Sequence, residues 1–196
     1  MNKAVFLDRD GVINPLIYNT ETCEYESPHF PEDFSIYPYV LKSLQLLKSL
    51  GFITIIISNQ PSYAKGKTSL ENIKTIENML YMFSEENGRL IDEYYYCYHH
   101  PEGIIPEYTQ KCQCRKPGTL FIEEAIKKNG LNIKECYLIG DQDTDIQCGI
   151  NIGINTIKIH NKHSIEKSGR ETANITVTNL YEAAIEIKKL QENKGE

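Results

Sequence analysis

Residues 4–14 read AVFLDRDGVIN, and the fold prediction begins from them. Ala4–Leu7 is a short apolar run, typical of a strand, that leads directly into Asp8 and Asp10. Residues i and i+2 of a strand share a face, so both carboxylates are expected to face one cavity, while Arg9 points elsewhere. Two close carboxylates repel each other unless a cation holds them, and such oxygen ligands suit Mg²⁺. An isolated Asp-x-Asp-Gly is also a common turn sequence, so the remaining strand ends must decide between the two interpretations.

Apolar runs alternate with helical patterns along the rest of the chain. Further strands are predicted at 52–58, 93–99, 136–141 and 156–160, and helices at about 40–50, 68–86, 119–130, 144–153 and 180–192. Thr68 and Glu71 form a capping-box pattern at the start of the second helix. This alternation predicts an α/β fold, a Rossmann-like three-layer sandwich with a mainly parallel central sheet. Two segments, 15–37 and 100–118, are rich in proline and are predicted to be irregular loops near the ligand site.

The composition limits the classes of protein that the chain can belong to. A length of 196 residues, with 40% hydrophobic and 24% charged residues, fits a single globular domain over 1–196. The net charge of -6 argues against nucleic acid or an anionic membrane as a partner. No apolar run has the length of a membrane span, and the first residues lack a signal peptide. We therefore expect a cytoplasmic monomer whose six cysteines are reduced.

Polar side chains stand at the ends of several predicted strands or just before a predicted helix. Each of them has a structural alternative, such as a turn, a solvated lysine or a helix cap. In an open α/β sheet, however, the ligand binds beyond the carboxyl ends of the strands, so these groups are expected to meet. The residues are Ser58, Asn59, Gln60, Arg115, Lys116, Asp141, Gln142, Asp143 and Asp145.

As a set, these motifs resemble the haloacid dehalogenase-like phosphatase superfamily. The resemblance spans roughly residues 4–160 and is specific because four motifs occur together in one order. It implies a magnesium-dependent phosphomonoesterase that forms an aspartyl-phosphate intermediate. The matching motifs are Asp8-x-Asp10, Ser58, Lys116 and Gly140-Asp141 with Asp145.

The resemblance also implies a role for each matched residue. Asp8 would be the nucleophile, and Asp10 would protonate the leaving oxygen and later take a proton from water. Ser58 would hydrogen-bond the transferring phosphoryl group. Mg²⁺ held by Asp8, Asp141 and the backbone carbonyl of Asp10 would neutralise the phosphate charge together with Lys116.

A second group of candidate ligands lies around the loop at 97–114. Cys97-x-His99 and Cys112-x-Cys114 each place two side chains on one side of an extended segment. Three thiolates and one imidazole complete a tetrahedral Zn²⁺ site with no open position, so the predicted zinc is structural. Ordinary buried cysteines in a reducing compartment are the alternative interpretation.

The zinc pattern resembles a branch of the superfamily with little or no cap domain and a zinc-stabilised loop. That branch includes D-glycero-D-manno-heptose 1,7-bisphosphate 7-phosphatase and histidinol-phosphate phosphatase, and the long loop here is more similar to the heptose enzyme. The resemblance implies a small sugar-phosphate substrate, with a heptose bisphosphate expected and histidinol phosphate or another small phosphate ester as the alternative. A sugar-phosphate-binding protein without catalysis is an alternative of a different class.

Without a cap domain, loops must select the substrate. The candidate loops are 15–37, Pro61–Lys67 and 97–114. Lys65 and Lys67 could reach a second phosphate, or could be solvated. The planar guanidinium of an arginine can bind phosphate through two hydrogen bonds, which a lysine cannot imitate. The predicted substrate-binding residues are Arg9, Asn59, Gln60, Arg115 and Gln142.

Overall fold

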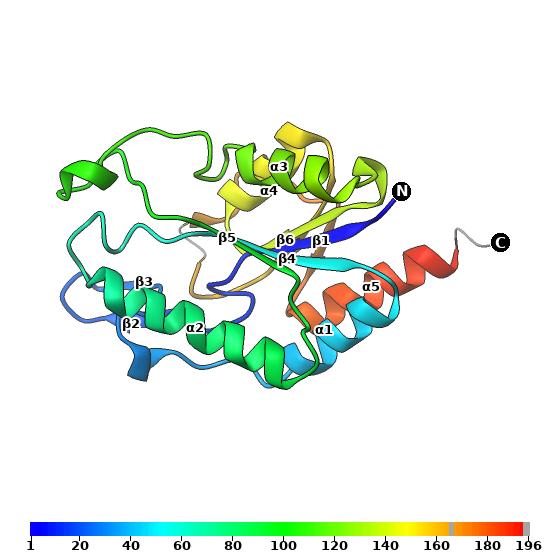
Figure 1. Ribbon diagram of the computed structural model, residues 1–196, viewed down its shortest axis with the longest axis horizontal. Helices are drawn as coiled ribbons and strands as arrows, with labels where there is room; N and C mark the ends of the chain where they lie inside the picture. The colour runs from blue at the N-terminus through cyan, green and yellow to red at the C-terminus, as the bar shows by residue number, and fades with distance from the viewer. Residues whose placement is uncertain (165–166, 194–196) are drawn as a thin grey trace.

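The structure is a computed structural model that describes residues 1–164 and 167–193. Within this part of the chain, six strands form one parallel sheet in the order β5-β4-β1-β6-β7-β8 (Figure 1). The predicted α/β class with a parallel central sheet is confirmed. The strands are β1 (Ala4–Leu7), β4 (Ile53–Asn59), β5 (Glu93–Cys97), β6 (Tyr137–Gly140), β7 (Asn155–Ile159) and β8 (Ile175–Val177).

Helices cover both faces of the sheet. Figure 1 shows α1, α2 and α5 on one side and α3 and α4 on the other, which gives the predicted three layers. Among the described residues, no helix combines the length and apolar character needed to cross a bilayer. The helices are α1 (Val40–Ser49), α2 (Leu70–Glu86), α3 (Leu120–Asn129), α4 (Asp143–Ile152) and α5 (Leu180–Glu192).

Strand β1 is apolar at every position because it is buried on both faces of the sheet. Val5 and Leu7 belong to the core beneath α1, α2 and α5, whereas Ala4 and Phe6 belong to the core beneath α3 and α4. All four side chains are fully buried. Alternate residues of a strand point to opposite faces, so a central strand that is covered on both faces must be apolar at every position.

The segment 15–37 differs from the irregular loop that was predicted. It contains an antiparallel hairpin of β2 (Ile17–Asn19) and β3 (Glu24–Glu26), followed by the 3-10 helix η1 (Pro31–Asp33). The hairpin lies apart from the main sheet, near the start of α2 (Figure 1). This small insertion agrees with the expectation of little or no cap domain.

The start of α2 corrects one detail of the sequence prediction. Ser69, not Thr68, is the N-cap residue, and its side chain accepts a 3.1 Å hydrogen bond from the backbone N–H of Asn72. The hydroxyl of Thr68 instead donates to the carbonyl of His29. Thr68 therefore ties the segment after the hairpin to the helix start, and the predicted capping box with Glu71 was wrong.

Candidate active site and metal centre

The carboxyl ends of three neighbouring strands bring the predicted catalytic side chains together. β1 lies between β4 and β6, and Asp8 and Asp141 follow β1 and β6 directly. Lys116 comes from the loop before α3 and reaches the same point. Sequence spacing alone placed these groups at one sheet edge, and the structure confirms that they meet there.

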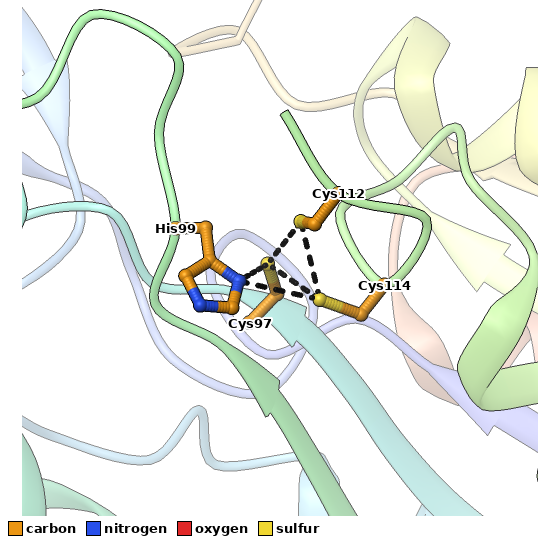
Figure 2. A group of neighbouring side chains, drawn as sticks. All are labelled: Cys97, His99, Cys112 and Cys114. Atoms are coloured by element: carbon orange, nitrogen blue, oxygen red, sulfur yellow. Dashed lines mark hydrogen bonds between the residues drawn. The ribbon is translucent and has the colours of Figure 1, made fainter. Parts of the chain in front are cut away.

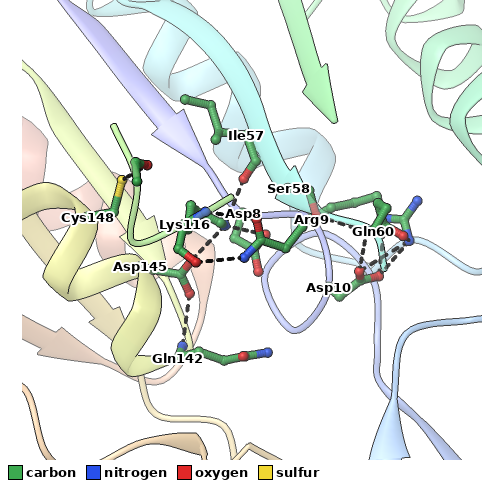
Figure 3. A network of polar contacts seen from close by, with 12 residues as sticks. Asp8, Arg9, Asp10, Ile57, Ser58, Gln60, Lys116, Gln142, Asp145 and Cys148 are labelled. Atoms are coloured by element: carbon green, nitrogen blue, oxygen red, sulfur yellow. Dashed lines mark hydrogen bonds and ion pairs between the residues drawn. The ribbon is translucent and has the colours of Figure 1, made fainter. Parts of the chain in front are cut away.

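Lys116 is the central cation of this edge. Its Nζ lies 2.7 Å from Asp8 Oδ1 and 2.6 Å from Asp145 Oδ1, and it donates a 2.8 Å hydrogen bond to the carbonyl of Ile57 (Figure 3). The lysine side chain is only 2% exposed. The ammonium group thus donates two hydrogen bonds and forms an ion pair with Asp145, and the cation is fixed against one oxygen of Asp8.

Asp145 and Asn59 hold Lys116 in this place. The second oxygen of Asp145, Oδ2, accepts a 3.0 Å hydrogen bond from the backbone N–H of Gln142. Asn59 pairs with both backbone groups of Lys116: its Oδ1 accepts from the N–H at 3.0 Å, and its Nδ2 donates to the carbonyl at 3.1 Å. Asp145, whose role the sequence left open, therefore uses both oxygens to position Lys116 and to begin α4.

The buried charges alter the acidity of the site. Burial, opposed by Lys116 and reinforced by Asp145, raises the pKa of Asp8 to about 6. Burial and the charges of Asp8 and Asp145 raise the pKa of Asp141 well above its ordinary value. Burial opposes the charge on Lys116, but Asp145 and Asp8 outweigh it and raise the pKa of the lysine. The pair of Asp8 and Asp141 thus has more negative charge than one lysine neutralises.

The same carboxylates offer a fitting site for a divalent cation. Oxygens of Asp8, Asp141 and Asp145 lie within 4.8 Å of one another, all in buried side chains. Among the residues that the structure describes, Oδ1 of Asp141 is buried without a hydrogen-bond partner, and its Oδ2 has only Asn161 Nδ2 at 3.4 Å. Buried carboxylate oxygens are costly when unpaired, so this donor set suits a hard cation such as Mg²⁺.

Gly11 allows the chain to pass this group closely. Its φ of +84° lies in the left-handed region, and a Cβ at this position would come within 2.1 Å of Asp141 Oδ2. A side chain would therefore collide with the carboxylate in addition to straining the backbone. The glycine of the Asp-x-Asp-Gly motif serves both the turn and the space that Asp141 occupies.

Asp10 lies in a separate hydrogen-bond network beside Asp8 (Figure 3). Its Oδ1 accepts from Arg9 Nε at 3.2 Å, from Arg9 Nη2 at 3.0 Å and from Asn14 Nδ2 at 2.9 Å. Its Oδ2 accepts from Gln60 Nε2 at 2.6 Å. Gln60 Nε2 also donates to Ser58 Oγ at 2.9 Å, which connects Asp10 with the predicted phosphoryl-binding hydroxyl.

An open cavity of about 210 Å³ lies beside the carboxylates of Asp8 and Asp10. Some of the predicted substrate-binding residues line this cavity, and others do not. Asn59, Arg115 and Gln142 line the cavity, as expected. Arg9 and Gln60 are buried behind it and contact Asp10 instead. For these two residues, the geometry does not support the predicted substrate contact.

A group of cations other than Lys116 also lines the cavity. Lys65, Lys67 and Arg115 line it, and Lys167 joins them from a segment in which the sequence analysis found no site residue. Burial and the charges of Lys67, Arg115 and Lys167 lower the pKa of Lys65. Such crowding of like charges is unfavourable unless an anion enters, so this group of cations suits an anionic ligand.

The β2–β3 hairpin forms one wall of the cavity. Glu24, Tyr25 and Glu26 line it, and Glu26 forms a 2.5 Å ion pair with Lys67. The ring of Tyr25 lies against that of His163, with 3.8 Å between the ring centroids. Strands of three residues carry too little periodicity to be recognised, and hence the sequence analysis missed these wall residues.

The predicted zinc ligands also come together. The Sγ atoms of Cys97, Cys112 and Cys114 lie 3.2–3.6 Å apart, and Nδ1 of His99 lies 3.5 Å from Cys114 and 3.9 Å from Cys97 (Figure 2). The cysteines are not bridged. Ligands at about 2.3 Å from a tetrahedral zinc would be about 3.8 Å apart, close to these separations. His100 lies outside the group, and its ring accepts from the N–H of Glu102.

Comparison with known proteins agrees with this geometry. A family model described as HAD-hydrolase-like matches residues 113–183. The chain is 37% identical over 152 residues to D-glycero-alpha-D-manno-heptose-1,7-bisphosphate 7-phosphatase of Photorhabdus laumondii, covering 78% of this chain and 79% of the relative. It is 31% identical over 182 residues to D-glycero-beta-D-manno-heptose-1,7-bisphosphate 7-phosphatase of Haemophilus ducreyi, covering 92% and 95% of the two chains.

A solved structure shares the fold over almost the whole chain. The D,D-heptose 1,7-bisphosphate phosphatase of B. bronchiseptica, complexed with magnesium and phosphate, superposes with a TM-score of 0.77 at 20% identity and covers 98% of this chain and 99% of its own. The fold, the motif residues at one sheet edge and the identity to two relatives over most of their lengths lead to one conclusion. The chain belongs to the haloacid dehalogenase-like phosphatases, in the family of these heptose-bisphosphate 7-phosphatases.

Proposed function

We propose that this phosphatase hydrolyses the 7-phosphate of a D-glycero-D-manno-heptose 1,7-bisphosphate. The observation that carries the proposal is the contact of Lys116 Nζ with Asp8 Oδ1 in a cavity that a further group of cations also lines. The first group suits phosphoryl transfer to a carboxylate, and the second suits another anionic group on the same substrate. The two relatives above are named for this substrate, although their names differ in the anomer.

In the first step, Asp8 acts as the nucleophile. Lys116 occupies Oδ1 of Asp8, so the other carboxylate oxygen forms the bond to phosphorus. The bond between phosphorus and the sugar oxygen breaks, and Asp10, which also lines the cavity, gives its proton to that oxygen. Ser58 hydrogen-bonds the transferring group, and Lys116 offsets the charge that would otherwise repel the phosphate.

In the second step, water hydrolyses the aspartyl-phosphate. Asp10 is now a carboxylate and takes a proton from the water while the water oxygen bonds to phosphorus. The bond between phosphorus and Asp8 breaks, and the carboxylate of Asp8 is restored with release of phosphate. One carboxyl group thus serves as acid and then as base, so both residues return to their starting states.

Both metal ions belong to the proposal. Mg²⁺ would be held by Asp8, Asp141 and the backbone carbonyl of Asp10, and would supply charge neutralisation at the phosphate. The buried Oδ1 of Asp141, which has no hydrogen-bond partner within residues 1–164 and 167–193, supports this assignment. Zn²⁺ would be held by the Cys97–His99–Cys112–Cys114 group in a structural role, since four protein ligands leave no open position.

The second phosphate of the substrate would lie among Lys65, Lys67, Arg115 and Lys167, which line the cavity. Glu26 already neutralises Lys67. For Lys65 and Arg115, the part of the chain that the structure describes holds no carboxylate partner. These two residues therefore supply unpaired positive charge for the phosphate that is not transferred, and Arg115 can bind it through two hydrogen bonds.

The proposal includes the setting in which the protein works. We expect residues 1–196 to form one domain that acts as a cytoplasmic monomer. The group of unbridged thiols supports a reducing compartment, because an oxidising one would favour disulfides over zinc ligation.

A phosphate-release assay tests the proposal. The substrates are the two anomers of the heptose bisphosphate, histidinol phosphate and fructose 1,6-bisphosphate, each with Mg²⁺ present. We expect a heptose bisphosphate to be preferred, and acid quenching of a ³²P-labelled reaction to trap a phosphorylated protein. Asp8→Asn should abolish both signals with unchanged circular dichroism, since an amide is not a nucleophile; loss of a nucleophile can cost on the order of 10⁶ in kcat. Faster turnover of histidinol phosphate would replace the heptose assignment.

A further inference from the structure

The polar network behind the cavity has a function of its own. We propose that Gln60 and Arg9 are positioning residues that hold Asp10 so that its Oδ2 carries the proton of the reaction. This inference rests on the proposed phosphatase mechanism, because it assigns the way in which the proton is delivered within that mechanism. It replaces the predicted substrate contacts of Gln60 and Arg9.

Arg9 fixes the orientation of the Asp10 carboxyl plane. The arginine is fully buried, and its Nε and Nη2 both donate to Asp10 Oδ1. The ring of Phe34 lies 6.0 Å from the guanidinium carbon. A buried, planar guanidinium with an aromatic neighbour has few alternative rotamers, so the carboxyl group that it binds is held in one plane.

The two oxygens of Asp10 are not equivalent. Oδ1 accepts three hydrogen bonds, two from Arg9 and one from Asn14. Oδ2 accepts a short bond of 2.6 Å from Gln60 Nε2 and a longer one of 3.2 Å from Arg9 Nη2. A carboxylate oxygen has about two lone-pair sites, so the three bonds to Oδ1 exceed its capacity. Arg9 Nη2 lies closer to Oδ1, at 3.0 Å, than to Oδ2, at 3.2 Å, so Gln60 is the main donor to Oδ2 and this oxygen keeps one site for a proton.

Gln60 places that oxygen relative to the phosphoryl group. Its Nε2 donates to Asp10 Oδ2 and to Ser58 Oγ at 2.9 Å, while its Oε1 accepts from Arg9 Nη2 at 2.8 Å. One amide therefore joins the acid to the hydroxyl that would hold the phosphoryl oxygens. The distance between the proton and the leaving oxygen is set through this link, and a loss of about 1 Å in such placement can lower a rate about 100-fold.

The choice of leaving group can distinguish a positioning role of Gln60 and Arg9 from a purely structural role. A sugar alkoxide is a poor leaving group and needs the proton from Asp10 as the P–O bond breaks. The p-nitrophenolate ion is stable without a proton, so its departure does not depend on that delivery. A defect in the placement of Asp10 must therefore slow phosphoryl transfer from an alkyl phosphate much more than transfer from p-nitrophenyl phosphate.

The test compares Gln60→Met with the wild type in single-turnover experiments with both esters. The methionine keeps the length of the side chain and removes its hydrogen bonds. We expect the rate of phosphoryl transfer from the heptose bisphosphate to fall about 100-fold, and that from p-nitrophenyl phosphate to fall less than about fivefold. Arg9→Lys, which keeps the charge and loses the planar fork, should show the same selective loss.

Two control variants complete the experiment. Gln142→Met changes a glutamine that lines the cavity without contacting Asp10, and should raise KM for the heptose bisphosphate more than it lowers the transfer rate. Gln147→Met, on α4 and partly exposed, should match the wild type with both esters. Equal losses with both esters in Gln60→Met and Arg9→Lys would overturn the positioning role. A wild-type protein that transfers phosphate from neither ester would instead overturn the proposed function.

Discussion

The backbone N–H of Gln60 donates a 2.7 Å hydrogen bond to the carbonyl of Cys97. One end of the Asp10 network is thus bonded to a residue of the cysteine–histidine group. A second connection runs along the chain, because Lys116 follows Cys114 by two residues. The cysteine–histidine group and the candidate active site are therefore connected through the backbone, and a structural change in one should affect the other.

The first prediction concerns zinc. Purified, unchelated protein should contain about one zinc per chain, and Cys112→Ser should lower the zinc content, the melting temperature and kcat together, because metal binding contributes to folding. Elemental analysis, thermal unfolding and the phosphate assay measure the three effects. Cys23→Ser, at an exposed cysteine outside the group, is the matched control and should change none of them. Protein that contains no zinc as isolated would contradict the assignment.

Substitution of Gly11 should damage the active site beyond ordinary backbone strain. Gly11→Ala would place a methyl group 2.1 Å from Asp141 Oδ2, so we expect kcat to fall at least about 100-fold and the Mg²⁺ concentration for half-maximal activity to rise. Gly153→Ala is the matched control, because Gly153 has a similar φ of +80° and no atom within 4 Å of its Cβ position.

Gly153→Ala should cost only the backbone strain of about 1–2 kcal/mol and leave kcat unchanged. Denaturant unfolding and steady-state kinetics distinguish the two variants. If Gly11→Ala and Gly153→Ala lose activity equally, the close approach of residue 11 to Asp141 is not the reason that residue 11 must be a glycine.

The ion pair of Glu26 and Lys67 should make the hairpin sensitive to acid. Burial opposes ionisation, but hydrogen bonds from Lys67 and Thr22 outweigh it and lower the pKa of Glu26. A lowered pKa in the folded state stabilises the protein above the unfolded value of about 4.3, and this stabilisation is lost as the pH falls below it.

Glu26→Gln should therefore lower the free energy of unfolding by about 1 kcal/mol at pH 7, with a smaller difference from wild type at pH 3.5. Denaturant titrations at the two pH values measure this change. Glu24→Gln removes an exposed carboxylate from the same strand and should have little effect at either pH. A difference for Glu26→Gln that grows as the pH falls would show that the sign of the linkage is wrong.

Selectivity for a bisphosphate should depend on Arg115. We expect kcat/KM for the heptose bisphosphate to exceed that for any monophosphate at least about tenfold, equivalent to about 1.4 kcal/mol. Arg115→Lys should reduce this ratio more than Lys65→Ala, because lysine keeps the charge but cannot form two parallel hydrogen bonds with a phosphate. Comparable ratios in both variants would indicate that charge alone selects the substrate.

The meeting of polar residues at one sheet edge could be predicted from the sequence because the patterns that indicate strands are local. The meeting of Asp8 with the polar ends of β4 and β6 required only that the strands be parallel neighbours. Both aspartates do line the cavity. The roles of Asp145 and Asn59 depend on a long-range contact with Lys116, which no local pattern specifies.

The direction of the Arg9 side chain does not follow strand periodicity. It was expected to point away from the two aspartates, yet its side chain binds Asp10. β1 ends at Leu7, and the chain then turns at Gly11, so alternation between faces no longer applies beyond Asp8. Lys167 and Tyr25 were missed for a related reason, since they come from segments without extended regular structure that meet only in the folded chain.

The hairpin of β2 and β3 supplies wall residues of the cavity, and a different part of the fold supplies the carboxylates and the lysine. The hairpin contributes Glu24, Tyr25 and Glu26 to the cavity wall, whereas Asp8 and Lys116 stand at the sheet edge. Insertions and substitutions in a surface hairpin disturb a core little, so substrate preference can diverge between relatives while the catalytic residues stay in place. A change in the hairpin is therefore expected to alter the cavity wall and to leave the sheet edge intact.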